Sequence, residues 1–310
     1  MIDPRDRDPN DLVRLDKLVA ERFGLSRRAA MEAVRNGRVD LEGTRCDEPG
    51  RLVATDSLLV FDPNRPRERK VVSKLRVLHE DRHLIVVDKP AGLLTLPTAA
   101  HEPGTLLERV TRYLTIRHGG RPYVGIVHRL DKDTSGALAL AKSPAALKAL
   151  QDLFRRHIIE RRYLAVVEGS PLRLRGTIDM PITNDRGDMR RGIAREPNEG
   201  RRAVTHYEVI ERFGPVASLV ACGLETGRTH QVRIHLAELG HPVLGEAVYR
   251  PRNQPRCKAT FKRQALHART LAFNHPLEHT EVRVEAPLPE DLDALILDLR
   301  HRFGIPGAGG

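Results

Sequence analysis

The sequence predicts an α+β protein with two domains, a small one followed by a larger one. Strand and helix patterns mix along the 310 residues without the regular period of a doubly wound sheet. The chain is long enough for a substantial core, and 40% of its residues are hydrophobic, which is typical of a globular protein. The polar, proline-containing segment 62–66 is predicted to separate the two domains.

The small domain is predicted to begin with two amphipathic helices. The first is indicated by apolar residues at helical spacing, namely Leu15, Leu18, Val19 and Phe23. The second has Ser26 as its N-cap and stops at Asn36-Gly37. Its inner face is expected to consist of Ala30, Ala33 and Val34. Short strands over 39–41 and 58–61, with a turn at Gly43, complete this domain.

The larger domain is predicted to start near Val77 and to be rich in strands. Apolar runs at 83–90, 136–141 and 163–167 indicate strands. The expected sheet is mixed and largely antiparallel, in keeping with the family resemblance described below. A helix is expected after Ser143-Pro144. Its inner face is predicted to carry Leu147, Leu150 and Phe154. The segment 183–202, rich in Asn, Arg and Gly, predicts a long mobile loop.

The net charge of +11 favours a polyanionic partner, because Lys and Arg neutralise phosphates. The excess is concentrated in three blocks. Residues 22–38 hold five Arg and one Glu, residues 65–76 hold six basic residues and one Glu, and residues 250–263 hold six basic residues without an acid. Solvated faces are the alternative for each block. Three blocks in one chain favour contact with nucleic acid.

Several classes of protein are excluded by what the sequence lacks. No apolar run approaches the roughly 20 residues of a membrane span, and the N-terminus lacks the apolar core of a signal peptide. The protein is therefore expected in the cytoplasm. Cys46, Cys222 and Cys257 are few and far apart, which predicts reduced thiols and neither a disulfide framework nor a metal site.

The segment 125–136 carries the densest group of polar, chemically active residues. An apolar strand leads into His128-Arg129-Leu130-Asp131, and Thr134-Ser135-Gly136 turns the chain into the next strand. A loop of this composition on a rigid scaffold is where functional residues tend to lie. A charged surface turn is the alternative interpretation of the same residues.

This segment resembles the signature of the RluA-type pseudouridine synthases, and four others resemble that family in the same order along about 77–300. The matching segments are Lys89-Pro90-Ala91-Gly92, residues 162–169 around Tyr163, residues 227–245 around Arg233, and His267-Ala268. The resemblance implies a catalytic domain of pseudouridine synthase type over 77–300. It also implies an isomerase that acts on uridine in RNA.

The resemblance implies a catalytic set of Asp131, Tyr163 and Arg233. The reaction breaks the bond from ribose C1′ to uracil N1 and rejoins the base through C5, without a redox change or a group donor, so no cofactor and no metal is expected. An ionised Asp131 either attacks C1′ or removes a sugar proton. Burial disfavours the charged carboxylate, and Arg233 is the expected cationic partner that opposes this effect. Tyr163 is expected to stack on the uracil and to help move the C5 proton.

Three further residues of the large domain are candidates for RNA contact. Arg129 is expected to occupy the gap left by a flipped-out base, which enzymes that act on bases require. His128 adjoins it, and His230 lies three residues before Arg233 and is predicted to share a helix face with it. The sequence departs from the usual family pattern at Leu96-Pro97, at Ala137 and at Glu246.

Residues 14–61 resemble the small RNA-binding domain known from ribosomal protein S-four. The matching residues run from Ser26-Arg27-Arg28 to Gly37-Arg38-Val39. The phosphate-binding candidates on this domain are Arg27, Arg28, Arg35 and Arg38. The predicted organisation is a disordered tail over 1–12, an α/β RNA-binding domain over 13–62, a basic linker over 63–76, the catalytic domain over 77–300 and a tail over 301–310.

Two other functions remain open at this stage. One is a catalytically silent RNA-binding assembly factor that keeps the fold, and the other is a glycosylase that releases free uracil. Ribosomal RNA is the expected substrate, because the small domain resembles that of ribosomal-RNA-directed members, and transfer RNA is the alternative. The protein is expected to act as a monomer.

Overall fold

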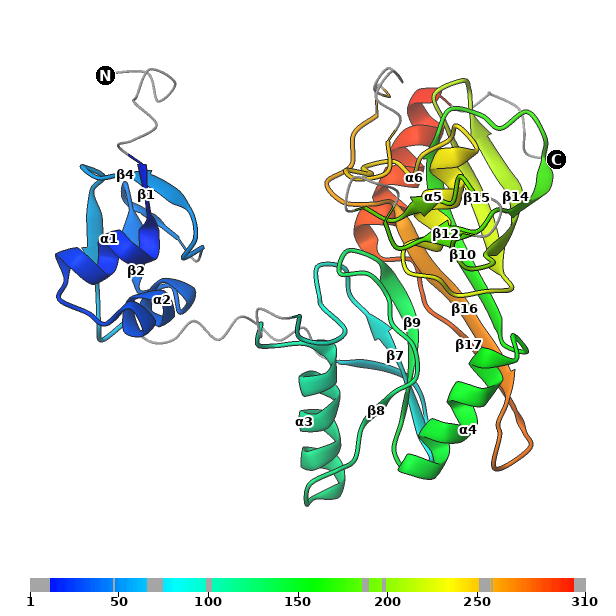
Figure 1. The fold of residues 1–310 in the computed structure, drawn as a ribbon, viewed down its shortest axis with the longest axis horizontal. Helices are drawn as coiled ribbons and strands as arrows, with labels where there is room; N and C mark the ends of the chain where they lie inside the picture. Colours follow the sequence, from blue (N-terminus) through cyan, green and yellow to red (C-terminus); the bar gives the residue numbers. More distant parts are fainter. Residues whose placement is uncertain are drawn as a thin grey trace. The chain divides into compact units, whose positions relative to one another are not determined.

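The computed structural model describes residues 12–46, 48–65, 75–98, 102–185, 190–196, 199–250, 257 and 259–303. The chain divides into two compact units, Met1–Ser73 and Lys74–Gly310 (Figure 1). Most of the predicted tails and of the predicted linker lies outside the described residues. The tail boundaries are wrong by a few residues, because Leu12 begins a strand and residues 301–303 end a helix.

The first unit packs two helices on short strands around a small apolar core. Its helices are α1 (Leu15–Arg22) and α2 (Arg27–Arg35). Its strands are β1 (Leu12–Arg14), β2 (Val39–Leu41), β3 (Thr44–Arg45), β4 (Leu52–Ala54) and β5 (Leu59–Phe61). The Ser26 hydroxyl accepts a hydrogen bond from the Ala29 N–H at 3.2 Å, and Asn36 is the C-cap of α2. Both predicted helix ends and the inner face of α2 are therefore confirmed.

The second unit is built on one ten-stranded mixed sheet. Its strands are β6 (Arg76–Glu80), β7 (Leu84–Lys89), β8 (Gly125–Ile126), β9 (Ser135–Ala141), β10 (Glu160–Glu168), β11 (Arg175–Asp179), β14 (Val204–Phe213), β15 (Ala217–Leu224), β16 (Leu266–Asn274) and β17 (Glu281–Glu285). Most neighbours follow the order β11-β14-β15-β10-β16-β9-β7-β6, while β8 pairs with β9 and β17 with β16. Strands β9 and β16 run parallel, and the other described pairs of this sheet are antiparallel.

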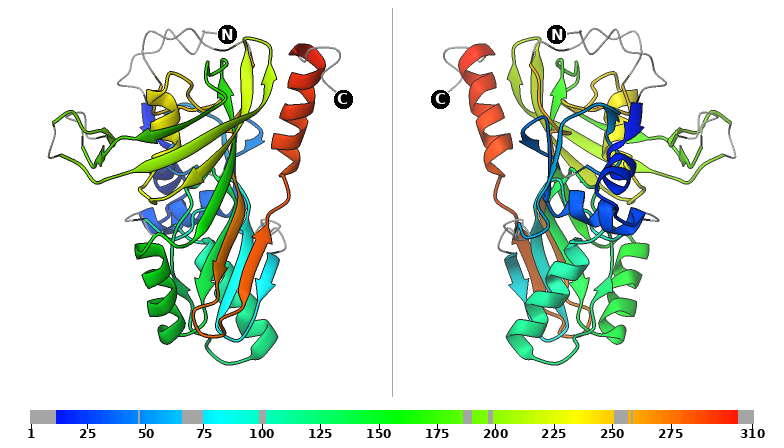
Figure 2. Two further views of the ribbon diagram at one scale, coloured as in Figure 1. Left: turned by 90° about the vertical axis from the view of Figure 1, so that its right-hand side faces the viewer. Right: turned by 90° about the vertical axis from the view of Figure 1, so that its left-hand side faces the viewer.

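Helices cover both faces of the β7–β9 part of the sheet, which explains its uninterrupted apolar runs. Alternate residues of a strand point to opposite faces. Ile85 and Val87 accordingly pack in the core with α3 (Leu106–His118), whereas Leu84 and Val86 pack with α4 (Pro144–Arg155). Farther along the sheet, α6 (Glu290–Phe303) packs against β14 (Figure 2).

The prediction of a long loop over 183–202 is wrong in part. Strands β12 (Ile182–Thr183) and β13 (Gly192–Ile193) form a hairpin, although residues 186–189 and 197–198 are not described. Ile182 is buried, and Ile193 packs partly buried, in a cluster with Ile234 and Tyr249. Two isolated isoleucines among polar residues gave no strand periodicity, and tertiary packing determines the structure here.

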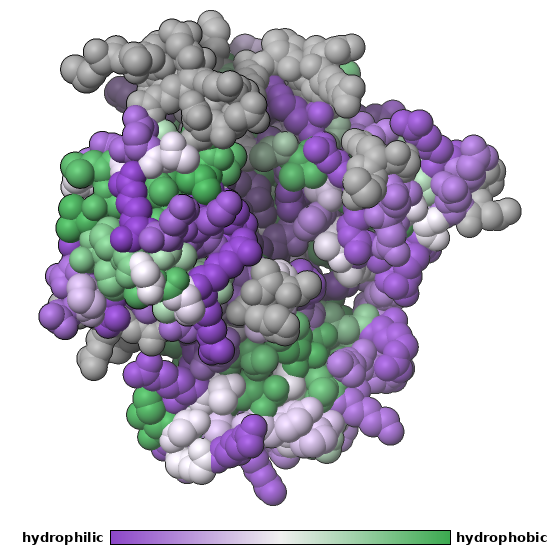
Figure 3. Space-filling model, turned by 60° about the vertical axis from the view of Figure 1, so that its left-hand side comes forward, coloured by the Kyte–Doolittle hydropathy of each residue, from purple (hydrophilic) through white to green (hydrophobic). Residues whose placement is uncertain are grey.

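The described helices include none that is both long and apolar enough to span a bilayer. Hydrophilic side chains are prominent on the face shown in Figure 3, with smaller apolar areas between them.

Candidate active site

A cavity of about 540 Å³ in the second unit gathers the residues that the sequence singled out. Asp131 comes from the loop before β9, Tyr163 from β10, and Arg233 from helix α5 (Gln231–Glu238). These elements are separated in sequence and meet around one hollow. The other lining residues predicted to contact RNA are His128, Arg129 and His230.

The loop that carries Asp131 is held by a hydrogen bond to each of four successive carbonyl groups. Thr95 Oγ1 donates to the Leu130 carbonyl at 3.0 Å, and the Thr134 N–H donates to that of Asp131 at 3.2 Å. Lys89 Nζ donates to the Lys132 carbonyl at 2.9 Å, and Arg263 Nη1 donates to the Asp133 carbonyl at 3.1 Å. Asp131 therefore projects from a fixed backbone, as a preorganised catalytic group requires.

The loop ends at Gly136 because two strands approach each other too closely for a side chain. Gly136 has a φ of +117° and lies opposite Ala268 in the parallel pair β9–β16. A Cβ atom at this position would lie 2.2 Å from the Ala268 carbonyl oxygen. Ser135 adds a buried hydrogen bond of 3.0 Å from its hydroxyl to the His267 ring. The Thr-Ser-Gly turn thus fits the backbone geometry that carries the loop.

Gly136→Ala is expected to lower the free energy of unfolding by about 3 kcal/mol, because it combines backbone strain with overpacking. Gly92→Ala is the control, since Gly92 also has a positive φ of +79° but open space around its Cβ position. Its expected loss is about 1–2 kcal/mol, from conformation alone. Urea denaturation of the purified variants measures both losses. Equal losses would contradict the steric account.

Asp131 is bound by an arginine that a second carboxylate holds in place. Arg233 Nη1 donates to Asp131 Oδ2 at 3.0 Å. The same guanidinium makes two hydrogen bonds, of 2.6 and 2.8 Å, to Glu246, whose side chain is fully buried. Backbone N–H groups of Val248 and Tyr249 also donate to Glu246. The result is a rigid carboxylate–arginine–carboxylate chain that ends at Asp131.

Within this hydrogen-bonded series, electrostatics favours the charged forms of Glu246 and Arg233. Burial acts to raise the pKa of Glu246, but the hydrogen bonds and charge of Arg233 outweigh it and lower that pKa. Burial also opposes the charge on Arg233, but Glu246 and Asp131 together raise the pKa of Arg233 above its ordinary value. Arg233 is therefore a permanent cation beside Asp131.

His230 faces the other oxygen of Asp131. It does not share a helix face with Arg233 as predicted, because it is the N-cap of α5 in the left-handed conformation, with a φ of +61°. Its Nε2 lies 3.6 Å from Asp131 Oδ1, and its Nδ1 lies 2.6 Å from the Tyr249 hydroxyl. Burial lowers the pKa of His230 and raises that of Tyr249. Tyr249 is therefore the donor to Nδ1, and the Nε2–H of a neutral His230 faces Asp131. Contact of His230 with RNA stays a prediction.

Tyr163 lines the cavity from β10 and is partly buried between two apolar clusters. Burial raises the pKa of Tyr163; the charge of Arg161 opposes this shift, and that of Asp131 adds to it. The phenol is therefore neutral near pH 7 and can donate a hydrogen bond. Its position beside Asp131 is compatible with both expected tasks, stacking on a base and moving a proton.

His128 and Arg129 differ sharply in their surroundings. The Ala139 N–H donates to His128 Nε2 at 3.0 Å, and the His128 ring stacks on Phe154 at 4.6 Å. Burial lowers the pKa of His128 to about 3, so its ring is neutral. Arg129 is exposed at the cavity lining. Any RNA contact by His128 therefore lacks a positive charge, whereas Arg129 is available as a cation.

The arginines predicted on the small unit lie on or near helix α2. Arg27, Arg28 and Arg35 are exposed. Arg28 lies at the limit of ion-pair distance from Glu32, 4.0 Å. Arg38 is half-buried and donates to the Arg65 carbonyl at 3.2 Å, so it also stabilises the domain.

Lys89 makes contacts beside the cavity that its sequence motif alone did not explain. Its side chain is fully buried, and its Nζ donates to the carbonyls of Pro90, Leu93 and Lys132. Burial lowers the pKa of Lys89 to about 7, and the charges of Asp133 and Asp131 oppose that shift. The Lys89 side chain ties the backbone at Pro90 and Leu93 to the loop of Asp131.

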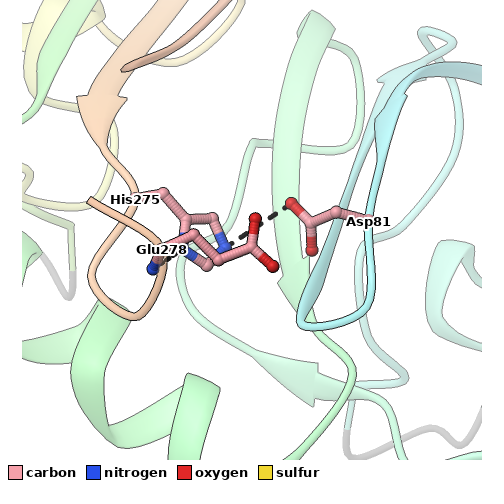
Figure 4. Close-up of side chains that lie close together, drawn as sticks. All are labelled: Asp81, His275 and Glu278. Atoms are coloured by element: carbon pink, nitrogen blue, oxygen red, sulfur yellow. Dashed lines mark hydrogen bonds and ion pairs between the residues drawn. The ribbon is translucent and has the colours of Figure 1, made fainter. Parts of the chain in front are cut away.

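One side-chain cluster outside the cavity has the composition of a metal site but not its hydrogen bonding. Ligand atoms of Asp81, His275 and Glu278 lie within 4.8 Å of one another (Figure 4). The N–H groups of Leu277 and Glu278 donate to His275 Nδ1 at 3.2 and 2.9 Å. The neutral ring must then carry its proton on Nε2, which faces Asp81 at 3.5 Å. His275 Nε2 has no hydrogen-bond partner among the described residues, but a ring that carries its proton on Nε2 and directs its Nδ1 lone pair at two N–H groups has no lone pair left for a metal ion.

The fold and the site together define a class of RNA-modifying enzymes. Residues 83–238 match the RNA pseudouridylate synthase family, and residues 13–58 match the S4 domain. The ribosomal large subunit pseudouridine synthase D of Xanthomonas campestris is 39% identical, over 93% of this chain and 89% of that protein. The uncharacterized RNA pseudouridine synthase YlyB of Bacillus subtilis is 38% identical, over 93% and 94% respectively.

Solved structures agree with the sequence comparisons. Human RNA pseudouridylate synthase domain containing 4 has a TM-score of 0.61 and 26% identity, covering 73% of this chain and 93% of that one. The chain belongs to the RNA pseudouridylate synthase family and is an RNA pseudouridine synthase with an N-terminal S4 domain.

Proposed function

We propose that this enzyme isomerises specific uridines in ribosomal RNA of the large subunit, with Asp131 as the catalytic carboxylate. The observation that carries the proposal is the Asp131 carboxyl group, bound by the buried Arg233 at 3.0 Å in a cavity shared with Tyr163. Relatives named ribosomal large subunit pseudouridine synthase D, 36–39% identical over most of this chain, support the choice of RNA.

Asp131 is suited to both forms of the chemistry. Attack on C1′ and removal of a sugar proton each require a charged carboxylate close to the ribose. Arg233 holds one oxygen, and His230 Nε2 lies 3.6 Å from the other. The carboxylate is thereby oriented, and its side chain remains 16% exposed, which leaves it accessible to a substrate in the cavity.

The remaining cavity residues serve the flipped nucleotide. A base stacked inside an RNA duplex cannot reach a carboxylate that lies in a cavity, so the target uridine must flip out of the stack of bases. Arg129, exposed at the cavity lining, fills the vacated space in the RNA. Tyr163 stacks on the uracil inside the cavity. Its neutral hydroxyl assists in passing the C5 proton to solvent after C5 has bonded to C1′.

The small unit anchors structured RNA through the exposed arginines of α2. Deleting residues 1–62 is expected to weaken RNA binding and flatten its salt dependence, because each lost phosphate contact lowers the log–log slope by roughly one. Arg27→Ala with Arg28→Ala should give part of this effect, since neither side chain is in the core. Filter binding across a salt series measures it. An unchanged slope together with a lost single-turnover rate would contradict this division of labour.

The direct test uses transcripts of large-subunit ribosomal RNA labelled with tritium at C5 of uridine. Exchange of the base attachment from N1 to C5 releases the C5 label to water, N1 takes up a proton from solvent, and the base stays attached to the RNA. A glycosylase would release free uracil, and an assembly factor would release nothing. Tritium release from this RNA and none from transfer RNA supports the proposal. Release from transfer RNA alone would contradict the assigned substrate.

A further inference from the structure

Besides Arg129, three arginines line the active-site cavity without a carboxylate partner in the part of the chain that the structure describes. They are Arg161 on β10, Arg201 before β14, and Arg228 in the turn before α5. We propose that these three arginines form a subsite for a phosphodiester group of the RNA strand that flanks the flipped nucleotide. The proposal rests on the proposed function and adds the place where the backbone of the substrate is held.

Arg161 is the central residue of this subsite, and its burial is unusual for an unpaired cation. The residue is 7% exposed. One guanidinium nitrogen donates to the carbonyls of Leu224 and Glu225, and the group lies over the Phe154 ring at 5.6 Å. Its Nε is buried and has no hydrogen-bond partner. A buried donor without an acceptor is costly, and it indicates that the acceptor is supplied by a ligand.

The comparison with Arg233 shows what Arg161 lacks. Arg233 is buried to a similar degree, yet it holds Glu246 with two hydrogen bonds and Asp131 with a third. Arg161 donates to the backbone carbonyl of Glu225 and not to its carboxylate. The Glu225 carboxylate is instead bound to Arg202 and His206. Arg161 therefore has carbonyl oxygens as acceptors but no negative charge.

The other two arginines adjoin Arg161 through the backbone. Arg161 Nη1 lies so close to Gly227 that a Cβ atom there would come within 2.4 Å of it, and Gly227 directly precedes Arg228. Arg228 Nε donates at 3.0 Å to the carbonyl of Arg202, the residue after Arg201. Burial lowers the pKa of both Arg161 and Arg228, and the charge of a neighbouring arginine adds to each shift. Three positive charges around one cavity repel each other, and an anion bound between them offsets that repulsion.

A phosphodiester fits this environment better than the uracil does. A uracil carbonyl carries no net charge, so it would satisfy the free Nε but not offset three cations. A phosphodiester supplies a full negative charge and oxygens that suit a guanidinium fork. Arg161 lies two residues from Tyr163 on β10, and both line the cavity. A base stacked on Tyr163 would therefore place its own backbone near Arg161.

The test replaces single phosphates of a short substrate hairpin by uncharged methylphosphonates, one at each position beside the target uridine. Wild-type enzyme is expected to bind one of these RNAs about tenfold more weakly, while its rate at saturating RNA changes less than about threefold. Arg161→Gln should show the same loss with natural RNA. It should show no additional loss with that methylphosphonate RNA, because the two changes remove one contact.

Additive losses in this cycle would overturn the proposal. It would also be overturned if Arg161→Gln lowered only the saturating rate and left binding unchanged, which would indicate stabilisation of the departing uracil. Tritium release by the wild-type enzyme is measured in parallel, so failure of the subsite is distinguishable from failure of the proposed function.

A second pair of variants guards against misfolding of Arg161→Gln. Arg201 and Arg202 are both exposed neighbours, but Arg202 is bound to Glu225 and does not line the cavity. Arg201→Ala is expected to lower the log–log salt slope of binding by about one and Arg202→Ala to leave it unchanged. Equal slopes for the two variants would overturn the assignment of Arg201 to the subsite.

Discussion

Asp131→Asn is expected to reduce the single-turnover rate of tritium release to background while RNA affinity and folding stay near wild type. Asparagine keeps the size and the ability to accept a hydrogen bond from Arg233, but it removes the charge that both chemical routes need. The loop itself should be unchanged, because its four anchors are bonds to backbone carbonyls. Single-turnover assays with saturating enzyme measure the chemical step alone.

Asp133→Asn is the matched control for that experiment. It removes the same charge from the same loop, and Arg263 binds the backbone carbonyl of Asp133, which the substitution leaves in place. Its rate is expected to stay within about threefold of wild type, less than 1 kcal/mol of barrier. Turnover by Asp131→Asn within about tenfold of wild type, which is about 1.4 kcal/mol, would contradict the catalytic assignment.

Arg233→Ala is expected to abolish activity and to destabilise the protein by about 3–5 kcal/mol, because it leaves Glu246 as a buried charge without a cation. Adding Glu246→Ala to Arg233→Ala should recover part of the stability and none of the activity. Urea denaturation and single-turnover assays on both variants separate the two effects. Recovered activity in the double variant would show that Arg233 matters only as the partner of Glu246.

The stability deficit of Arg233→Ala is also expected to depend on pH. In wild type the pKa of Glu246 is lowered by Arg233, so its contribution is present above the ordinary pKa of a glutamate and is lost as pH falls through the lowered value. Without Arg233, burial is the largest influence and raises the pKa of Glu246 against the two backbone N–H donors, and the penalty disappears when the carboxyl takes up a proton. The difference from wild type should therefore shrink as pH falls from 7 toward 4.5. A difference that stayed constant would contradict this account.

Residues whose role follows from local pattern could be predicted from the sequence. The Ser26 cap, the Asn36-Gly37 stop and the strand at 136–141 depend on nearby residues, and the structure confirms them. The grouping of Asp131, Tyr163 and Arg233 could be expected only because the chain resembles a family. Neither spacing nor periodicity predicts that a loop, a strand and a helix far apart in the sequence line the same cavity.

The roles of residues that act through partners distant in the sequence could not be predicted from the sequence. Glu246 was noted as a departure from the family pattern, and its bond to Arg233 appears only when α5 packs beside the turn that carries it. His230 was expected inside a helix, but its left-handed backbone makes it the cap and turns its ring toward Asp131. Arg161 carried no signal at all, since burial without an acid partner is a property of the folded structure alone.

The measurement that tests the central claim most directly is pseudouridine mapping in large-subunit ribosomal RNA from cells that lack this protein. The cells are complemented either with the wild-type chain or with Asp131→Asn. We predict that a small set of pseudouridines disappears in the deletion, returns with wild type, and stays absent with Asp131→Asn produced at the same level. Return of those pseudouridines with Asp131→Asn, or their persistence in the deletion, would contradict the assignment of Asp131 as the catalytic group of a ribosomal RNA pseudouridine synthase.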